Sequence, residues 1–163
     1  MNRDNPLGTE GKLAAAYAEF IQNMWLPFHH TFNPYEFKST VNFATDIFEK
    51  YTQHNSQEFF SFLVDGIHED LNRIKNKPDA DLVEDEGRKD EAVALESWMA
   101  NTKRNQSIIT DVMTGQYKSK IVCPGCLCES ITFHPFRSVS LPIPEESAPG
   151  VLKYYIMFKD NEK

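Results

Sequence analysis

Three cysteines stand close together in the second half of the chain, at positions 123, 126 and 128. Cys123 and Cys126 are separated by Pro and Gly, and such a tight turn brings both sulfurs to one side. Two thiolates provide half of the tetrahedral ligand set of zinc, and Cys128 and His134 are the nearby residues that could complete it. The sequence therefore predicts a zinc half-site at Cys123 and Cys126, with a plain β-turn carrying reduced thiols as the alternative.

The same cysteines could also act as nucleophiles. A catalytic thiol normally needs a histidine within hydrogen-bond reach, and often a helix N-terminus, to lower its pKa. His134 is expected on the strand after the turn, at a spacing that suits structural packing. His68 is expected inside a helix near Asp65 and Asn72, where hydrogen bonding to a neighbour is the simpler role. We therefore predict no catalytic residue in this chain.

A polar cluster with the sequence QHNSQEF occupies residues 53–59. Asn55 can serve as a helix N-cap, and Glu58, three residues later, can bond back to the N–H of the cap. Across residues 60–74, apolar side chains recur at steps of three and four, which places them on one stripe of an α-helix. Further phenylalanines lie outside that stripe. The sequence therefore predicts a core helix that begins at Asn55 and packs on two sides.

Residues 53–59 and the helix after them resemble the glutamine-rich box and following helix of the ubiquitin-specific proteases. Further stretches resemble landmarks of that family in the same order, namely residues 2–8, 32–34, 37–38, 98, 104–105, 107–108, 115–116, 118–119, 123–126 and 140–144. The resemblance implies part of a papain-like cysteine protease fold, a thumb-like helical subdomain followed by antiparallel strands. It also implies the reaction of the parent domain, hydrolysis of the isopeptide or peptide bond after the terminal glycine of ubiquitin by an activated thiolate.

The resemblance further implies a binding role for the polar cluster. In that family the residues around the box line the channel that receives the extended C-terminal tail of ubiquitin, and acidic groups face the arginines of the tail. By position these residues are Gln53, Asn55 and Glu58. Asn55 stands where the family usually has Asp, so a neutral contact replaces a charge-assisted one that would be roughly twice as strong. Helix capping by Asn55 and Glu58 is the alternative role, and the two roles can coexist.

The catalytic groups of that family are expected outside these residues. Its nucleophilic cysteine lies before the residues that match positions 2–8, and its catalytic histidine and second cysteine pair lie beyond position 163. The resemblance therefore implies that this chain alone is inactive and that its partners are ubiquitin or a ubiquitinated protein and the remaining part of the catalytic domain. A non-catalytic ubiquitin-binding or scaffolding module and a zinc-knuckle interaction domain are the alternative functions.

Composition narrows the class of partner. The 163 residues are 40% apolar, enough for one domain or a part of one. The net charge of −7 argues against nucleic acid, since phosphate binding rests on clustered Lys and Arg. No run of about eighteen apolar residues and no charged-then-apolar leader is present, which predicts a soluble, non-exported chain without membrane contact. An odd number of cysteines is typical of reduced thiols in the cytoplasm or nucleus.

The elements that must position these residues can be predicted from periodicity. Helices are expected at residues 10–25, 34–42, 55–74 and 93–105, with a short helix or turn at 108–113, and strands at 117–123, 130–133, 136–141 and 151–158. An acidic stretch at about 76–91 has little apolar content and is expected to be a flexible insertion. The predicted class is therefore α+β, with a helical subdomain at 1–113 and a β-rich portion at 114–163 that contains the cysteine knuckle.

Overall fold

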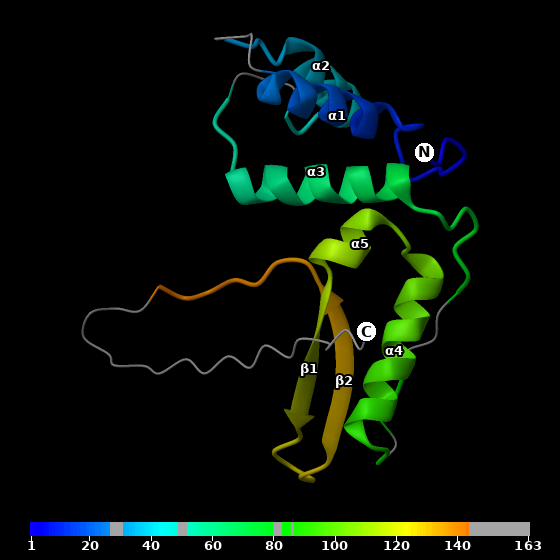
Figure 1. Cartoon of the computed structure of the whole chain (residues 1–163). Coiled ribbons are helices and arrows are strands. Elements are labelled where there is room, and N and C mark those ends of the chain that lie inside the picture. The colour runs from blue at the N-terminus through cyan, green and yellow to red at the C-terminus, as the bar shows by residue number, and fades with distance from the viewer. Residues whose placement is uncertain (27–30, 49–51, 80–82, 86, 144–163) are drawn as a thin grey trace.

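The computed structural model of the chain describes residues 1–26, 31–48, 52–79, 83–85 and 87–143 (Figure 1). In this part of the chain, helices come first and an antiparallel pair of strands follows. The helices are α1 (Lys12–Trp25), α2 (Tyr35–Ala44), α3 (Ser56–Leu71), α4 (Asp90–Arg104) and α5 (Ile108–Met113), and the strands are β1 (Gly115–Val122) and β2 (Glu129–Phe136). The predicted α+β class is confirmed.

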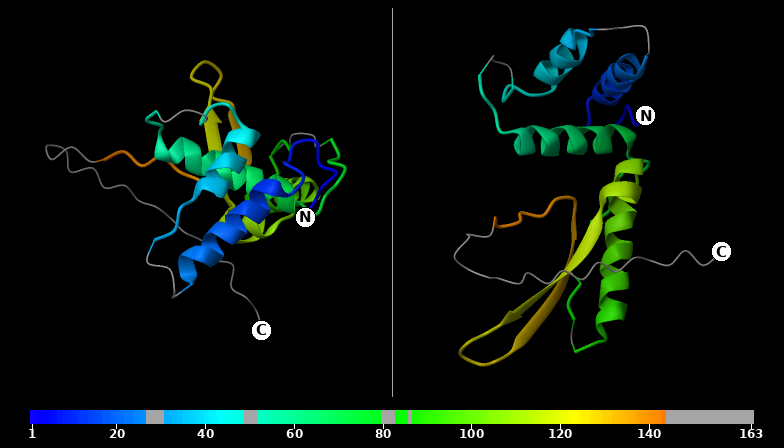
Figure 2. Two further views of the ribbon diagram at one scale, coloured as in Figure 1. Left: turned by 90° about the horizontal axis from the view of Figure 1, so that it is seen from above. Right: turned by 60° about the vertical axis from the view of Figure 1, so that its left-hand side comes forward.

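Helix α3 is the middle layer of the molecule. It lies between α1 and α2 on one side and α4, α5 and the hairpin on the other, as Figures 1 and 2 show from three directions. Leu13, Val41 and Phe48 form a buried cluster on the α1–α2 side, and Phe59 and Phe62 of α3 pack against it. The Phe48 ring centroid is 5.3 Å from that of Phe59 and 5.4 Å from that of Phe62. The predicted packing of this helix on two sides is therefore confirmed.

Two residues were expected to cap the start of α3, and one of them does so. Asn55 is the N-cap, and its side chain accepts a hydrogen bond of 2.9 Å from the backbone N–H of Gln57. The expected return bond from Glu58 to the cap is not among the hydrogen bonds of the described residues. The helix end is therefore stabilised by Asn55, and the carboxylate of Glu58 is not used for capping.

A buried amide determines where α3 ends. Asn72 is 1% exposed, and its side chain accepts from the backbone N–H groups of Ile74 and Gln106, each at 3.1 Å. It also donates to the carbonyl of Arg104 at 3.0 Å. These bonds replace the helical pattern, so α3 ends at Leu71 rather than at the predicted Ile74. The same side chain joins the end of α3 to the end of α4.

The start of α1 is stabilised by a carboxylate from the end of α3. Asp70 is completely buried and accepts from the backbone N–H groups of Thr9, Gly11 and Ala14 at 2.6, 3.1 and 3.1 Å, and from the Thr9 hydroxyl at 2.7 Å. Glu10 and Gly11 have φ values of 59° and 85°, so the helix begins after them and not at the predicted Glu10. The four donors would otherwise be buried without a partner.

The two strands form a regular hairpin against α4. Their register runs from Gly115 opposite Phe136 to Val122 opposite Glu129, and residues 123–128 form the connecting loop. The Ser97 hydroxyl of α4 donates to the carbonyl of Phe133 at 2.8 Å, which ties the helix to β2. Figure 1 shows α4 beside β2, and Figure 2 shows the tip of the hairpin diverging from the helix.

Two further predictions differ from the structure, and a third falls outside the described residues. The predicted strand at 136–141 is wrong, because Phe136 ends β2 and residues 137–143 have no neighbouring strand with which to form a ladder among the described residues. The predicted strand at 151–158 lies outside the described residues. The acidic stretch predicted at 76–91 ends earlier, since α4 begins at Asp90. Its first turn contains Asp90 and Glu91, where carboxylates interact favourably with the helix dipole.

None of the helices in the described residues has the length and apolar content needed to cross a membrane.

Candidate functional site

The residues predicted to bind the ubiquitin tail lie at the N-terminal end of α3. Gln53, Asn55 and Glu58 are all exposed. Asn55 also lines a mostly apolar cleft of about 650 Å³, whose walls come from α1, α2 and the start of α3. Gln53 and Glu58 do not line that cleft but flank the lining residues in sequence. All three side chains are therefore accessible to a partner at one end of one helix.

His54, which lies between Gln53 and Asn55, is held in place by neighbouring side chains, whereas the side chains of Gln53 and Glu58 are not. The His54 imidazole bonds to the Thr52 hydroxyl at 2.9 Å and meets the Phe48 ring edge-on at 5.2 Å. By contrast, the side chains of Gln53 and Glu58 make no hydrogen bond or ion pair within the described part of the chain. The free carboxylate and amide are therefore available to a cationic or polar ligand.

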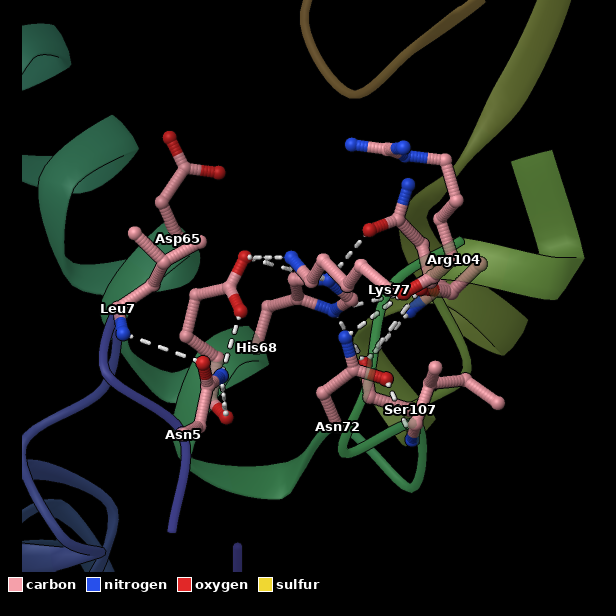
Figure 3. A network of polar contacts seen from close by, with 12 residues as sticks. Asn5, Leu7, Asp65, His68, Asn72, Lys77, Arg104 and Ser107 are labelled. Carbon is pink, nitrogen blue, oxygen red and sulfur yellow. Dashed lines mark hydrogen bonds and ion pairs between the residues drawn. The ribbon is translucent and has the colours of Figure 1, made fainter. Parts of the chain in front are cut away.

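A buried polar network joins α3 to α4 and α5, and His68 lies at its centre (Figure 3). His68 is 2% exposed; its Nδ1 is 2.7 Å from the Ser107 hydroxyl, and its Nε2 is 3.3 Å from Oδ1 of Asn105. The Asn105 amide nitrogen donates to Asn101 at 2.8 Å, so the Asn105 oxygen that faces Nε2 must accept, and the Ser107 hydroxyl donates to Nδ1. We therefore assign the tautomer in which Nε2 carries the proton and donates to Asn105.

The environment of His68 favours its neutral form. Burial, followed by the positive charge of Arg137, lowers the pKa of His68 below its usual 6.5, although the Asn105 hydrogen bond and the charge of Glu69 oppose the shift. The three hydrogen-bond partners of His68 all lie more than thirty residues later in the chain, and the third is the Thr110 hydroxyl, 3.4 Å from Nδ1. Sequence spacing could not identify them, because Ser107 and Asn105 belong to a different element from His68. His68 therefore has a structural role, and none of the described hydrogen bonds joins it to a cysteine thiol.

The lowered pKa of His68 predicts a loss of stability in mild acid. The unfolded chain takes up the proton near pH 6.5 and the folded chain only at lower pH, so stability should decrease as pH falls below about 6.5 and level off once the folded histidine also titrates. The size is about 1.4 kcal/mol for each unit between the two pKa values. Urea unfolding between pH 5.5 and 7.5 measures this slope. His68→Gln should flatten it, whereas His54→Gln, at an exposed position, should not. An equal slope in both variants would contradict the assignment.

A half-buried carboxylate next to His68 fixes the first residues of the chain. Glu69 bonds to the Lys77 ammonium at 2.6 Å and to the Asn5 amide at 2.7 Å. Burial raises the pKa of Glu69, but the Lys77 and Asn5 hydrogen bonds outweigh it and hold that pKa below its usual value. The contribution of Glu69 to stability is therefore lost only as pH falls below about 4.5, the usual value for a glutamate.

The three cysteines lie together on the exposed loop of the hairpin, and all are free thiols. The backbone N–H of Cys123 donates to the carbonyl of Cys128 at 2.9 Å, and that of Leu127 donates to the carbonyl of Cys123 at 2.9 Å. Leu127 has a φ of 56°, the left-handed conformation that reverses the chain after Cys126. The backbone N–H of Cys128, followed by the thiols of Cys123 and Cys128, lowers the pKa of the Cys126 thiol. The turn therefore gathers the sulfurs and favours a thiolate.

Of the two candidates that would complete a metal site, Cys128 lies in this loop and His134 does not. His134 lies on β2, bonds to the Thr132 hydroxyl at 2.9 Å, and packs beside Tyr117 at a ring distance of 5.5 Å. Within the described residues, no group of three or more His, Cys, Asp or Glu side chains is arranged to hold a metal ion. The donor set of the loop therefore fits part of a zinc site, and none of the described hydrogen bonds makes a Cys–His catalytic pair.

Comparison with known proteins places the chain in one family. The family model described as "Ubiquitin carboxyl-terminal hydrolase" matches residues 1–139. The chain is 48% identical over 146 residues to human ubiquitin carboxyl-terminal hydrolase 19, and the aligned region covers 90% of this chain and 11% of that protein. It is 46% identical over 144 residues to ubiquitin carboxyl-terminal hydrolase 8 of Arabidopsis thaliana, which covers 88% of this chain and 16% of that protein. With ubiquitin carboxyl-terminal hydrolase 15 of Bos taurus it shares 46% identity over 160 residues, 98% of this chain and 17% of that protein. The chain thus spans about a tenth to a sixth of the length of these relatives.

Proposed function

The chain belongs to the ubiquitin carboxyl-terminal hydrolase family, and on that premise we propose that it forms part of a papain-like cysteine protease domain and supplies one wall of the groove for the ubiquitin tail. The main support is the exposed start of α3, where Asn55 is the N-cap and Glu58, three residues later, has no hydrogen bond or ion pair within the described residues. A carboxylate without an internal partner is suited to bind the guanidinium of a tail arginine through charge-assisted hydrogen bonds.

The contribution of this wall to the parent reaction is positioning. Thiol-dependent hydrolysis requires the carbonyl of the last glycine of ubiquitin to lie within reach of an activated thiolate, and binding of the preceding tail residues supplies that orientation. Cys123, Cys126 and Cys128 have no catalytic role in this proposal, because none of them is joined to a histidine in the described structure. The 163-residue chain alone is accordingly proposed to be inactive, and the nucleophile and base belong to the remaining part of the catalytic domain.

The cysteine hairpin has a separate place in the proposal. Cys123 and Cys126 would provide two thiolates of a structural zinc site, and a zinc ion bound there would fix the end of the hairpin. Three exposed free thiols are typical of a reducing compartment, and we therefore propose a cytoplasmic or nuclear protein. The helices at 1–113 and the strands from 114 onward would be two portions of one catalytic domain, one on each side of the ubiquitin tail.

Charge changes at the end of α3 should alter ubiquitin affinity in opposite directions. Glu58→Gln removes the charge but keeps the shape, so it should weaken binding of ubiquitin to the chain roughly fivefold, about 1 kcal/mol. Asn55→Asp restores a carboxylate that remains a good N-cap, and it should strengthen binding by a similar factor. Calorimetric titration with ubiquitin at low salt measures both effects. Glu19→Gln, an exposed glutamate of α1, is the matched control and should leave the affinity unchanged.

Two results would contradict the proposal. One is a chain that shows no binding to ubiquitin, or binding that is equal for intact ubiquitin and for ubiquitin whose tail has been removed. The other is cysteine-dependent cleavage of a fluorogenic ubiquitin substrate by the 163-residue chain, which would place a nucleophile among residues that have no catalytic pairing in the structure. Binding to the tail without cleavage supports the proposed groove wall.

A further inference from the structure

A second pocket, of about 290 Å³, lies where α3 meets α4, α5 and the end of β2. Phe60, Ser61, Val64 and Asp65 of α3 line one wall, and residues 135–138 line another. Among the described residues, three buried side-chain atoms lack a hydrogen-bond partner, and two of them belong to the lining of this pocket, Nδ2 of Asn101 and Oγ1 of Thr114. Buried polar groups are nearly always paired, so these two groups are free to bond to a ligand that enters the pocket.

The direction of the hydrogen bonds leading to the pocket determines what that ligand must be. The Ser107 hydroxyl donates to His68, the Nε2–H of His68 donates to Asn105, and the Asn105 amide donates to Oδ1 of Asn101 at 2.8 Å. Since Oδ1 of Asn101 is the acceptor in this chain, the amide nitrogen of Asn101 is left as a donor. The ligand must therefore present a hydrogen-bond acceptor to Asn101.

The charges at the pocket favour a neutral acceptor over an anion. Asp65 of α3 and Arg137 of the other wall form an ion pair. A carboxylate ligand would meet the charge of Asp65 and would have to compete with it for Arg137. A peptide carbonyl has no net charge, and its neighbouring N–H can donate to the Thr114 hydroxyl. The lining thus matches a main-chain peptide group better than an acid.

We propose that this pocket receives a main-chain peptide group of an extended polypeptide, with the amide of Asn101 donating to its carbonyl oxygen and the hydroxyl of Thr114 accepting its N–H. The inference rests on the proposed function, under which the extended polypeptide is the ubiquitin tail continuing along α3 from Glu58. Both unpaired atoms are covered in this structure. The Asp65–Arg137 ion pair joins the two walls, and we expect it to open as the tail enters.

Two variants of the 163-residue chain test the role of the pocket. In Asn101→Asp the bond from Asn105 keeps its acceptor, while the group directed at the ligand changes from a donor to an acceptor. We expect its Kd for ubiquitin to rise about tenfold. Thr114→Val removes an unpaired hydroxyl. We expect this variant to bind ubiquitin more weakly while its unfolding temperature stays the same or rises. A purely structural role for Thr114 would not produce that combination. Asn76→Asp, at an exposed position, carries the same charge change and should bind like the wild type.

The outcomes separate this inference from the proposed function. The side-chain amide signal of Asn101 should shift when intact ubiquitin is added and should not shift with ubiquitin that lacks its tail. If the wild type binds ubiquitin through its tail but both variants bind equally well, the pocket has no part in binding, and the proposed function remains. If the wild type does not bind ubiquitin, both proposals fail. If Asn101→Asp does not fold, Thr114→Val alone decides, and an unchanged Kd for it overturns the inference.

Discussion

Replacing Asp70 by alanine should destabilise the chain by about 4 kcal/mol or more, the largest effect that we expect from a single polar substitution. The carboxylate accepts four hydrogen bonds, three from backbone N–H groups at the start of α1 and one from the Thr9 hydroxyl. Without it, these donors are buried with no partner, and each costs about 1–3 kcal/mol. Chemical denaturation followed by circular dichroism measures the loss.

Asp70→Asn gives a finer test of the same site. An amide keeps one oxygen acceptor but presents N–H groups where the other carboxylate oxygen accepts from Ala14, so two donors would face each other. We expect a loss smaller than that of alanine but still above about 1 kcal/mol. Asp46→Ala, at an exposed position, should change stability by less than about 0.5 kcal/mol. An Asp70→Ala chain as stable as this control would contradict the capping role.

The second large effect concerns the contact between α1 and α3. Leu13 is completely buried, and a Cβ added to Gly66 would lie 2.5 Å from Cδ2 of Leu13. Leu13→Ala should cost about 3 kcal/mol through the cavity that it leaves. Gly66→Ala should also destabilise, because the steric overlap outweighs the gain of about 1 kcal/mol in helix propensity. Thermal or urea unfolding of each variant gives the two values.

The double variant is the decisive measurement for this contact. With alanine at position 13, the Cβ at position 66 enters space that the leucine has vacated, so the combined loss should be smaller than the sum by about 1–2 kcal/mol. As a control, Leu13→Ala combined with Val93→Ala, a buried residue of α4 outside the α1–α2 cluster, should be additive. Strict additivity for the first pair would mean that Gly66 is not needed for the close approach of the two helices.

Much of the fold could be predicted because it depends on local signals. Three- and four-residue spacing predicted α3, and a side chain next to the helix predicted its start at Asn55. Alternation of side chains around the turn at residues 123–128 likewise predicted the hairpin. The exposure of Gln53 and Glu58 agrees with a binding role, which remains a prediction until ubiquitin binding is measured.

The features that sequence reasoning missed depend on partners far away along the chain. The sequence predicted a hydrogen bond from His68 to a neighbour in its own helix and no role for Asp70, although both side chains are buried. Their partners lie near positions 9–14 and 105–110, and no local pattern connects these segments. The incorrect strand at 136–141 has a similar cause, because a strand forms only where another strand supplies hydrogen bonds.

The carboxylate of Asp70 also has a consequence for the order in which the chain acquires structure. The donors that it satisfies precede it by 56 to 61 residues, so the first turn of α1 cannot be completed until α3 has been synthesised and has docked. During translation, the apolar face of α1 therefore stays exposed until Asp70 has been synthesised. Long-range closure of this kind slows folding relative to helical domains built from local contacts. A ribosome stalled shortly before position 70 should therefore hold α1 in a protease-sensitive state, and one stalled well after it should not.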